Sequence, residues 1–472
     1  MNTNYSTSFI NDGEINDLLA RGREAAAGEA GAIIARAGEA RGLSPAEAAV
    51  LLNVEDESLL QSMYETARKI KNDIYGRRLV FFAPLYISNY CVNSCYYCGY
   101  RCSNGEMARK KLSMEEIEEE VRILESLGHK RLAVECGEHP VESPLEYVLE
   151  AIKTIYSVKE KNGSIRRLNI NIAATGVEEY KRLKEAGIGT YILFQETYHR
   201  DTYRAMHPRG PKSDYAFHLT AMHRAMEGGI DDVGIGVLYG LYDYKYEVVA
   251  TLLHALDLEE KFGVGPHTIS VPRMRPAQGV SVENFPHLVS DAEFKKLIAV
   301  LRLAVPYTGI ILSTRERPEF RDELISIGVS QVSAGSCTGV GGYKEEYGGE
   351  AAEHCQNTAQ FNVEDRRSPD EVIQNVCRSG YIPSFCTACY RRGRTGDRFM
   401  TLAKSGDIGN VCQPNAILTF KEYLLDYATE QTRKIGEETI RKHLLEISSP
   451  AIRAQTEERL QRIAMGERDL YF

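Results

Sequence analysis

Three features are missing from this 472-residue sequence, and each absence excludes a class of protein. The chain has no run of about eighteen apolar residues, so we expect no membrane span. Residues 1–30 contain no apolar segment between a basic start and a small-residue cleavage site, which argues against a secretory signal peptide. The formal net charge is −9, whereas proteins that bind nucleic acid usually present an excess of basic residues. We therefore expect a cytoplasmic protein without nucleic-acid or membrane partners.

Cysteine is present in an odd number, 11, which does not suit a framework of disulfides. Reduced thiols in a cytoplasmic protein are free to bind metal. Two groups of three have the spacing of metal ligands and are treated below. The remaining cysteines have no assigned role, and they are Cys102, Cys136, Cys337, Cys355 and Cys377.

Short apolar runs alternate with helical patterns between residues 79 and 336. Strands that are separated by helices imply a parallel sheet with right-handed crossovers. Eight such units in about 250 residues fit a (β/α)8 barrel of the TIM type, and a doubly wound open sheet is the alternative. The expected strands are residues 79–87, 131–136, 168–174, 190–195, 233–240, 267–272, 309–314 and 329–335.

The segments on both sides of the predicted barrel are mostly helical. Residues 1–78 show apolar residues at helical spacing and form an expected N-terminal extension. Residues 337–367 are rich in glycine and charge and indicate a connecting loop. Residues 368–472 begin with the capping box Ser368-Pro-Asp-Glu371 and predict a helical C-terminal domain that binds a second cluster.

The first cysteine group, Cys91, Cys95 and Cys98, directly follows the first expected strand with the spacing CxxxCxxC. One short loop of this kind can give three thiolates to three irons of a cubane cluster. The fourth iron is then left open, as in reactive rather than structural metal sites. A zinc site with Cys102 as the last ligand is the alternative, although this spacing is tight for tetrahedral zinc.

This motif, with the aromatic Tyr97 before its last cysteine, resembles the signature of radical S-adenosylmethionine (SAM) enzymes. The resemblance implies a 4Fe-4S cluster on Cys91, Cys95 and Cys98 whose open iron chelates the amine and carboxylate of SAM. It also implies that an electron from the cluster cleaves SAM to a 5′-deoxyadenosyl radical. The barrel would orient the cofactors and exclude water.

Further residues of the expected SAM site follow from the same resemblance. Glu138, in Cys136-Gly137-Glu138, is similar to the glutamate that receives the SAM amino group. The glycine-rich strand with Gly234 and Gly236 is similar to the strand that packs against adenine. The resemblance further assigns cofactor binding to Tyr97, Asn171 and Arg204, with Arg204 at the SAM carboxylate.

The second group consists of the pair Cys386 and Cys389 and the more distant Cys412. Three thiolates in this arrangement favour a second iron–sulfur cluster. A redox-active CxxC would need a βαβ context, which is missing, and zinc would need a fourth ligand, for which His443 is the only later histidine. The basic run 391–394 either forms a solvated face or offsets the charge of a cluster or anion.

Two further segments resemble a narrower family, the aromatic amino-acid lyases of the radical SAM superfamily. Residues 195–199 (QETYH) and 203–208 (YRAMHP) are similar to the tyrosine lyases, and the second cysteine group is similar to those that mature FeFe-hydrogenase. The resemblance implies cleavage of the L-tyrosine Cα–Cβ bond to p-cresol and dehydroglycine, begun by loss of an amino hydrogen. Dehydroglycine then becomes carbon monoxide and cyanide on iron at the second cluster, for assembly of the hydrogenase active site.

The same resemblance implies ligands and partners. The auxiliary cluster carries an extra labile iron held by His267, with free cysteine at that iron, although a lone histidine at a strand start is more often capped or in the core. Arg315, at the barrel mouth, suits the tyrosine carboxylate, with an ion pair to Glu316 or Glu319 as the alternative. Glu196 is assigned to the SAM ribose or the substrate. A ferredoxin or flavodoxin as reductant and other hydrogenase maturases are the implied protein partners.

Two other functions remain as alternatives at this point. A thiamin-type 2-iminoacetate synthase would release dehydroglycine and form p-cresol, without carbon monoxide or cyanide. An iron–sulfur scaffold or electron-transfer protein would not turn over SAM, and it would leave the motifs around Glu138 and Gly234 unexplained.

Overall fold

The centre of the molecule is a closed barrel of eight parallel strands, seen in a computed structural model that describes residues 5–25, 27–348 and 358–472. Strand β1 pairs with both β2 and β8, and these pairings close the barrel. The expected barrel is therefore confirmed, and the open sheet is excluded. The barrel strands are β1 (Arg78–Ser88), β2 (Arg131–Cys136), β3 (Arg167–Asn171), β4 (Thr190–Ile192), β5 (Asp232–Gly236), β6 (Thr268–Ser270), β7 (Gly309–Leu312) and β8 (Gln331–Ser333).

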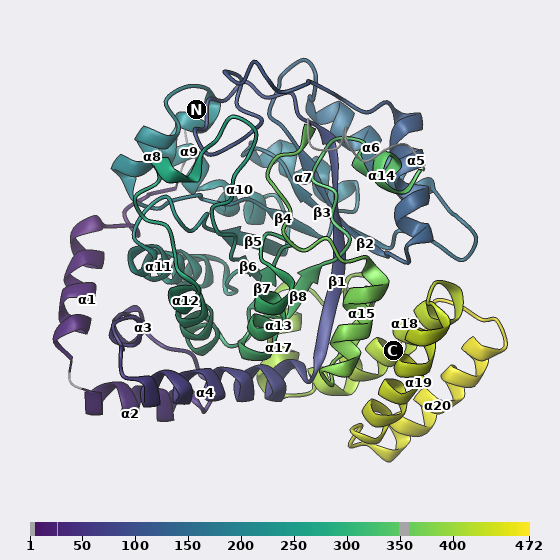
Figure 1. Cartoon of the computed structure of the whole chain (residues 1–472). Helices are drawn as coiled ribbons and strands as arrows, with labels where there is room; N and C mark the ends of the chain where they lie inside the picture. Colours follow the sequence, from purple (N-terminus) through teal and green to yellow (C-terminus); the bar gives the residue numbers. More distant parts are fainter. Residues whose placement is uncertain (1–4, 26, 349–357) are drawn as a thin grey trace.

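Helices surround the barrel and connect its strands (Figure 1). Two of them, α5 and α12, begin at capping boxes in which Ser113 and Ser290 accept a hydrogen bond from the backbone three residues later. The connecting helices are α5 (Met114–Ser126), α6 (Leu145–Ser157), α7 (Val177–Glu185), α8 (Arg200–Met206), η1 (Pro211–Ser213), α9 (Tyr215–Leu219), α10 (Ala221–Glu227), α11 (Tyr244–Phe262), η2 (Val282–Asn284), α12 (Asp291–Ala304) and α13 (Pro318–Ile327).

The N-terminal extension is helical, as expected, and lies along one flank and the lower end of the barrel in Figure 1. Its third helix begins at Pro45, with Ser44 as the N-cap. The extension consists of α1 (Asp12–Glu24), α2 (Ala27–Ala37), α3 (Pro45–Leu52) and α4 (Glu57–Tyr75). Within the described residues, no helix is both long and apolar enough to cross a membrane.

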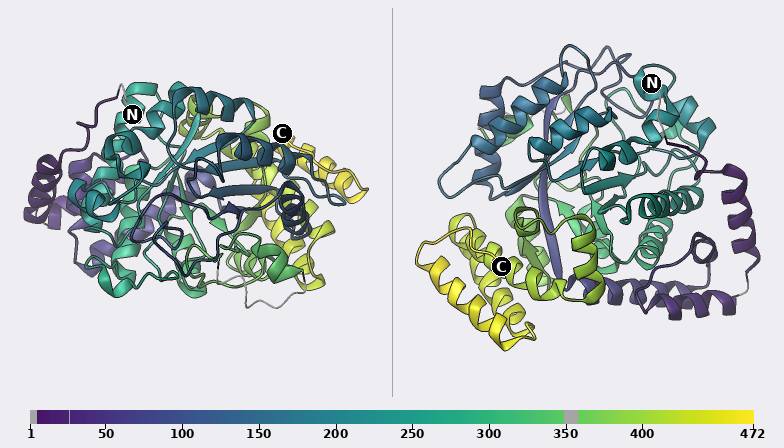
Figure 2. Two further views of the ribbon diagram at one scale, coloured as in Figure 1. Left: turned by 90° about the horizontal axis from the view of Figure 1, so that it is seen from above. Right: turned by 180° about the vertical axis from the view of Figure 1, so that it is seen from behind.

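A ninth strand, β9 (Ile382–Ser384), pairs in parallel with the start of β1. The sequence analysis expected mostly helices in this region, because a strand of three residues is too short to show a periodicity. This pairing attaches the C-terminal domain to the end of the barrel where β1 begins, opposite the loop that follows β1 (Figures 1 and 2). Strand β9 ends two residues before Cys386 and so fixes the position of the second cysteine group.

The rest of the C-terminal region is helical, as expected. The segment predicted as a connector contains a short helix, α14 (Gly342–Tyr347), and Cys355 within it lies outside the described residues. The further helices are α15 (Pro369–Arg378), α16 (Ala388–Arg391), α17 (Gly396–Ser405), α18 (Ile408–Asp426), α19 (Glu430–Leu445) and α20 (Pro450–Ala464).

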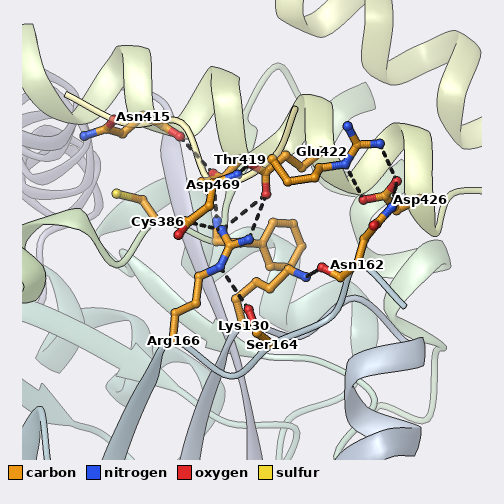
Figure 3. Close-up of polar contacts among 12 residues, drawn as sticks. Lys130, Asn162, Ser164, Arg166, Cys386, Asn415, Thr419, Glu422, Asp426 and Asp469 are labelled. Atoms are coloured by element: carbon orange, nitrogen blue, oxygen red, sulfur yellow. Dashed lines mark hydrogen bonds and ion pairs between the residues drawn. The ribbon is translucent and has the colours of Figure 1, made fainter. Parts of the chain in front are cut away.

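A buried ion-pair group fastens the C-terminal domain to the barrel (Figure 3). Arg166, just before β3, lies 3.2 Å from the carboxylate of Glu422 on α18 and 3.0 Å from that of Asp469. Glu422 also accepts a hydrogen bond from the backbone N–H of Asp469. Arg468 pairs with Asp426 at 2.6 Å. The chain around Asp469 is thus held between α18 and the barrel.

We predict that Glu422→Ala lowers the free energy of unfolding by about 2 kcal/mol, because the Arg166 side chain, which is 8% exposed, then keeps only the more exposed Asp469 as its ion-pair partner. Urea denaturation of both proteins measures the difference. Glu438→Ala is the matched control, because Glu438 pairs with Lys442 on the exposed face of α19 and should change stability by less than about 0.5 kcal/mol. Equal effects of the two substitutions would contradict this role of Glu422.

Candidate active site and second cysteine site

A cavity of about 440 Å³ lies at the carboxyl ends of the barrel strands. This volume is within the range of about 300–1,000 Å³ for small-molecule sites. Its walls come from the loops that follow β1, β2, β4 and β7, the end of a (β/α)8 barrel at which active sites form. Cys91, Cys95 and Cys98 all line this cavity, as the sequence analysis expected.

The loop that carries these cysteines is held in place by backbone hydrogen bonds to the last residue of α8 and to the segment that follows it. Ser94 N–H donates to the carbonyl of Arg209 at 3.0 Å, and Tyr96 N–H donates to that of Met206 at 3.1 Å. Burial raises the pKa of the Cys98 thiol to about 11. Such thiols ionise readily only when a cation such as iron compensates for their burial.

Tyr97 also lines the cavity, and its hydroxyl is fixed by a buried hydrogen bond. The partner is His207 Nε2, at 2.7 Å, and His207 belongs to the YRAMHP segment. The resemblance in that segment therefore has a structural counterpart: its histidine orients the aromatic residue of the cysteine motif.

Glu138 lies in the same cavity, where Asn93 Nδ2 donates a hydrogen bond to its carboxylate at 2.5 Å. Burial raises the pKa of Glu138. The preceding Gly137 is required for close packing, because a Cβ at this position would lie 2.3 Å from the carbonyl oxygen of Tyr90. A bound ammonium group would compensate the buried carboxylate, so this site suits the amino group of SAM.

The structure places a cation in the cavity that the sequence analysis missed. Lys212 Nζ lies 2.7 Å from the carboxylate of Glu196, and both residues line the cavity. The pKa of Lys212 lies above its usual range. Burial lowers this pKa, but the negative charges of Glu196 and Cys95 raise it by more. Glu196 has a positive φ of 68°, a costly conformation for a non-glycine residue. No motif marks Lys212, which enters the site only because the chain turns at Gly210.

Arg204 lies outside the cavity. Its side chain is 81% exposed and forms an ion pair with Asp201, one turn earlier on α8. The structure thus does not bring Arg204 together with the other residues assigned to SAM.

The remaining residues assigned to the cofactor occupy two different positions. Asn171, at the end of β3, lines the cavity and donates a hydrogen bond to Glu135 at 2.6 Å. Gly234 and Gly236 lie in the barrel wall on β5. A Cβ at Gly236 would lie 2.7 Å from the ring of Phe194, so this glycine makes room for a side chain that itself lines the cavity.

Arg315 lies buried in the cavity with its guanidinium 3.3 Å from the centre of the Phe361 ring. Within the described residues, no hydrogen bond or ion pair of this guanidinium is found. The alternative of an ion pair with Glu316 is excluded, because Glu316 pairs with Arg273 and Arg275. Arg315 is thus a buried cation available to a ligand carboxylate.

The second cysteine group lies at the opposite end of the barrel. A cavity of about 80 Å³ there is lined by Cys386, Cys389, Cys412 and His267. The hydrogen bond with the Cys389 thiol, aided by Arg78, lowers the pKa of the Cys412 thiol. The structure therefore brings together three thiols, from the turn after β9, from α16 and from α18, and one imidazole that directly precedes β6.

His267 is oriented by two neighbours. Its Nε2 lies 3.1 Å from the Tyr390 hydroxyl, and its Nδ1 lies 3.6 Å from the carboxylate of Asp232. Burial lowers the pKa of His267, which favours the neutral imidazole that binds metals. A carboxylate behind an imidazole is the usual support of a metal-binding histidine.

Arginines surround the second cavity, and several of their buried nitrogens have no hydrogen-bond partner among the residues that the structure describes. These atoms are Arg78 Nη2, Arg131 Nε and Arg394 Nε. Positive charge beside three thiols fits an anionic iron–sulfur cluster. Arg394 comes from the basic run 391–394, so at least this member of the run faces the cavity rather than solvent.

Among the residues that the structure describes, no three His, Cys, Asp or Glu side chains are placed to hold a metal ion. The ligands of one tetrahedral ion lie close together. In a cubane each thiolate binds a different iron, so the cysteines lie further apart.

Comparisons with known proteins agree with this geometry. A model of the radical SAM superfamily matches residues 85–256, and a model of the Biotin and Thiamin Synthesis associated domain matches residues 270–382. With three cysteines in CxxxCxxC spacing at the mouth of a parallel barrel, the protein is a radical SAM enzyme, a class that uses a 4Fe-4S cluster and SAM.

Individual relatives narrow the class. A crystal structure of HydG, described as a maturase of the FeFe-hydrogenase, is 64% identical, with a TM-score of 0.95 over 99% of this chain and 100% of that one. HydG from Carboxydothermus hydrogenoformans is 40% identical, with a TM-score of 0.82 over 95% of this chain and 97% of that one. The 2-iminoacetate synthase of Salmonella typhimurium is 30% identical over 75% of this chain and 90% of that protein. The chain belongs to the HydG family.

We predict that Lys212→Met weakens SAM binding about tenfold or more, because it removes the cation beside Cys95 and leaves Glu196 buried and unpaired. Arg204→Ala should keep the affinity for SAM within about twofold of wild type, because the Arg204 side chain is exposed and lies outside the cavity. Equilibrium binding of SAM to the reconstituted proteins measures both. A loss in Arg204→Ala as large as that in Lys212→Met would instead support Arg204 at the SAM carboxylate.

Proposed function

We propose that this protein is a hydrogenase maturase that cleaves the Cα–Cβ bond of L-tyrosine to p-cresol and dehydroglycine and converts dehydroglycine to carbon monoxide and cyanide on iron. The observation that carries the proposal is the second cysteine site with His267, at the opposite end of the barrel from the SAM site. The HydG structures, which match the whole chain including this domain, support it.

At the first site, the bound 4Fe-4S cluster and SAM supply the radical that starts the reaction. The protein's own residues hold the reactants. Arg315 binds the tyrosine carboxylate, and Glu138 binds the SAM amino group. Tyr97 and the Lys212–Glu196 pair line the same cavity. The closed barrel excludes water and so limits hydrolysis of dehydroglycine.

At the second site, Cys386, Cys389 and Cys412 would hold an auxiliary cluster, and His267 would bind an additional labile iron, with free cysteine as a further ligand. The support is the orientation of His267 by Asp232 and Tyr390. A radical SAM enzyme also needs a reductant, for which we propose a ferredoxin or flavodoxin. The other hydrogenase maturases would be its partners in assembly.

The similarity to 2-iminoacetate synthases favours a second candidate, in which dehydroglycine is the released product. That protein's match covers 75% of this chain. In this second candidate, the three cysteines and His267 at the lower end of the barrel would have no part in the reaction.

Reduced, reconstituted protein with SAM and tyrosine should yield p-cresol, cyanide and carbon monoxide. We predict that the double variant Cys386→Ala/Cys389→Ala keeps p-cresol formation within about threefold but loses the two diatomic products, because only the second site is removed. Cys377→Ala is the matched control, as a buried cysteine outside both cavities. Chromatography and gas analysis measure the products.

His267→Ala should likewise retain p-cresol and lose most of the cyanide and the labile iron. Wild-type protein that forms p-cresol without cyanide or carbon monoxide would favour the 2-iminoacetate synthase. The absence of all three products would contradict both lyase functions.

A further inference from the structure

A buried carboxyl group in the barrel has no role in the scheme so far. Glu135, on β2, is in register with Tyr86 on β1 and with Asn171 on β3. Residues at equivalent positions on adjacent parallel strands point the same way, and all three line the SAM cavity. Glu135 therefore faces the interior of the barrel, below the cysteine loop.

Glu135 differs from the other glutamates of the cavity in its partners. Glu196 pairs with Lys212, and Glu138 lies beside Asn93 close to the cysteine loop. In the described part of the chain, the carboxylate of Glu135 accepts one hydrogen bond, from Asn171, and contacts no cation. Burial raises the pKa of Glu135 to about 8, while Asn171 and the more distant Arg315 oppose the rise.

Arg315 and Glu135 share both cavities of the upper barrel. They line the 440 Å³ cavity and also a smaller one of about 90 Å³ that lies deeper between the strands. Within the described part of the chain, Arg315 is a half-buried cation without an ion-pair partner, and Glu135 is a half-buried acid that contacts no cation. An α-amino acid carries the two complementary charges on one carbon atom, so it can satisfy both groups at once.

We propose that Glu135 faces the amino group of bound tyrosine and takes its ammonium proton. In this step the N–H bond of the ammonium breaks, an O–H bond forms on Glu135, and the products are a neutral amine and a neutral carboxylic acid. No electron is transferred. The inference rests on the proposed function, because it assigns a residue to the tyrosine substrate.

Two physical arguments support the direction of the transfer. Burial destabilises both charges of a carboxylate–ammonium pair. The neutral pair of carboxylic acid and amine is therefore more favoured in the cavity than it is in water. Loss of a hydrogen atom from the neutral amine leaves a neutral radical. Loss of a hydrogen atom from the ammonium group would instead leave a radical cation, and burial penalises its charge. Arg315 holds the carboxylate meanwhile, so the proton leaves the nitrogen without displacing the substrate.

The first test is a proton count on tyrosine binding to oxidised, SAM-loaded protein, in which no turnover occurs. At pH 7 a carboxyl group with a pKa of about 8 is about nine-tenths protonated, so in most molecules Glu135 must lose its own proton to solvent before it accepts the ammonium proton, and wild type should release about 0.9 proton on tyrosine binding. The release should fall as the pH rises above 8, because a smaller fraction of the carboxyl group then carries a proton before tyrosine binds. The Glu135→Gln variant keeps an oxygen atom that can accept the hydrogen bond from Asn171, and it should release no proton on tyrosine binding. Calorimetry in buffers with different heats of ionisation gives the count.

The second test is the pH dependence of p-cresol formation by the reduced enzymes. Glu135→Gln should be about a hundredfold slower at pH 7, a typical loss for a missing proton acceptor. The difference in rate between Glu135→Gln and wild type should shrink as the pH rises through the pKa of the tyrosine amino group, because tyrosine then arrives without the ammonium proton. The other groups that face Glu135 are Tyr86, whose pKa burial raises well above its usual value, the Lys212-paired Glu196, and the cationic Arg315.

Glu120→Gln is the matched control, because Glu120 is a buried carboxyl with a raised pKa that lies on α5, against the backbone of α14. It should behave as wild type in both tests. If Glu135→Gln matches wild type in either test, or is slower by the same factor at every pH, the proposal is overturned. If wild type forms no p-cresol, the proposed function itself fails, which is a distinguishable result.

Discussion

Strand β1 is hydrogen-bonded at both of its ends, and both cysteine sites depend on it. Its 11 residues span more than the height of its neighbours. Residues 80–82 of β1 pair with β8, and the carboxyl-terminal part of β1 pairs with β2, so that β1 closes the barrel and delivers the loop with Cys91 to the upper cavity. Its first residues pair with β9, which delivers Cys386 to the lower cavity. A register change in β1 would therefore move both sites together.

The two sites differ in the charges that surround them. The upper cavity is lined by carboxyl groups and by cations that include Lys212 and Arg315, which suits zwitterionic ligands such as SAM and an amino acid. The lower cavity contains thiols, a neutral imidazole and several arginines, which suits an anionic metal cluster. The barrel wall keeps these environments apart, so one chain can hold two different chemistries.

Much of this arrangement could be predicted from the sequence. The eight barrel strands follow from apolar runs, and both cysteine groups follow from spacing, because these signals are local in the chain. Other features depend on contacts that no local pattern encodes. Strand β9 is too short to show a periodicity, Lys212 enters the cavity through a turn, and Arg204 faces solvent, where it pairs with the exposed Asp201. Glu135 gains its properties only from burial beside Asn171.

The central claim is that one barrel holds two independent clusters at its two ends. Electron paramagnetic resonance of the reduced protein, with iron analysis, tests this most directly in two triple variants, Cys91→Ala/Cys95→Ala/Cys98→Ala and Cys386→Ala/Cys389→Ala/Cys412→Ala. Wild type should give two cluster signals, each variant should lose a different one, and SAM should change only the signal that needs Cys91, Cys95 and Cys98. A single signal in wild type, or loss of the same signal in both variants, would contradict the account.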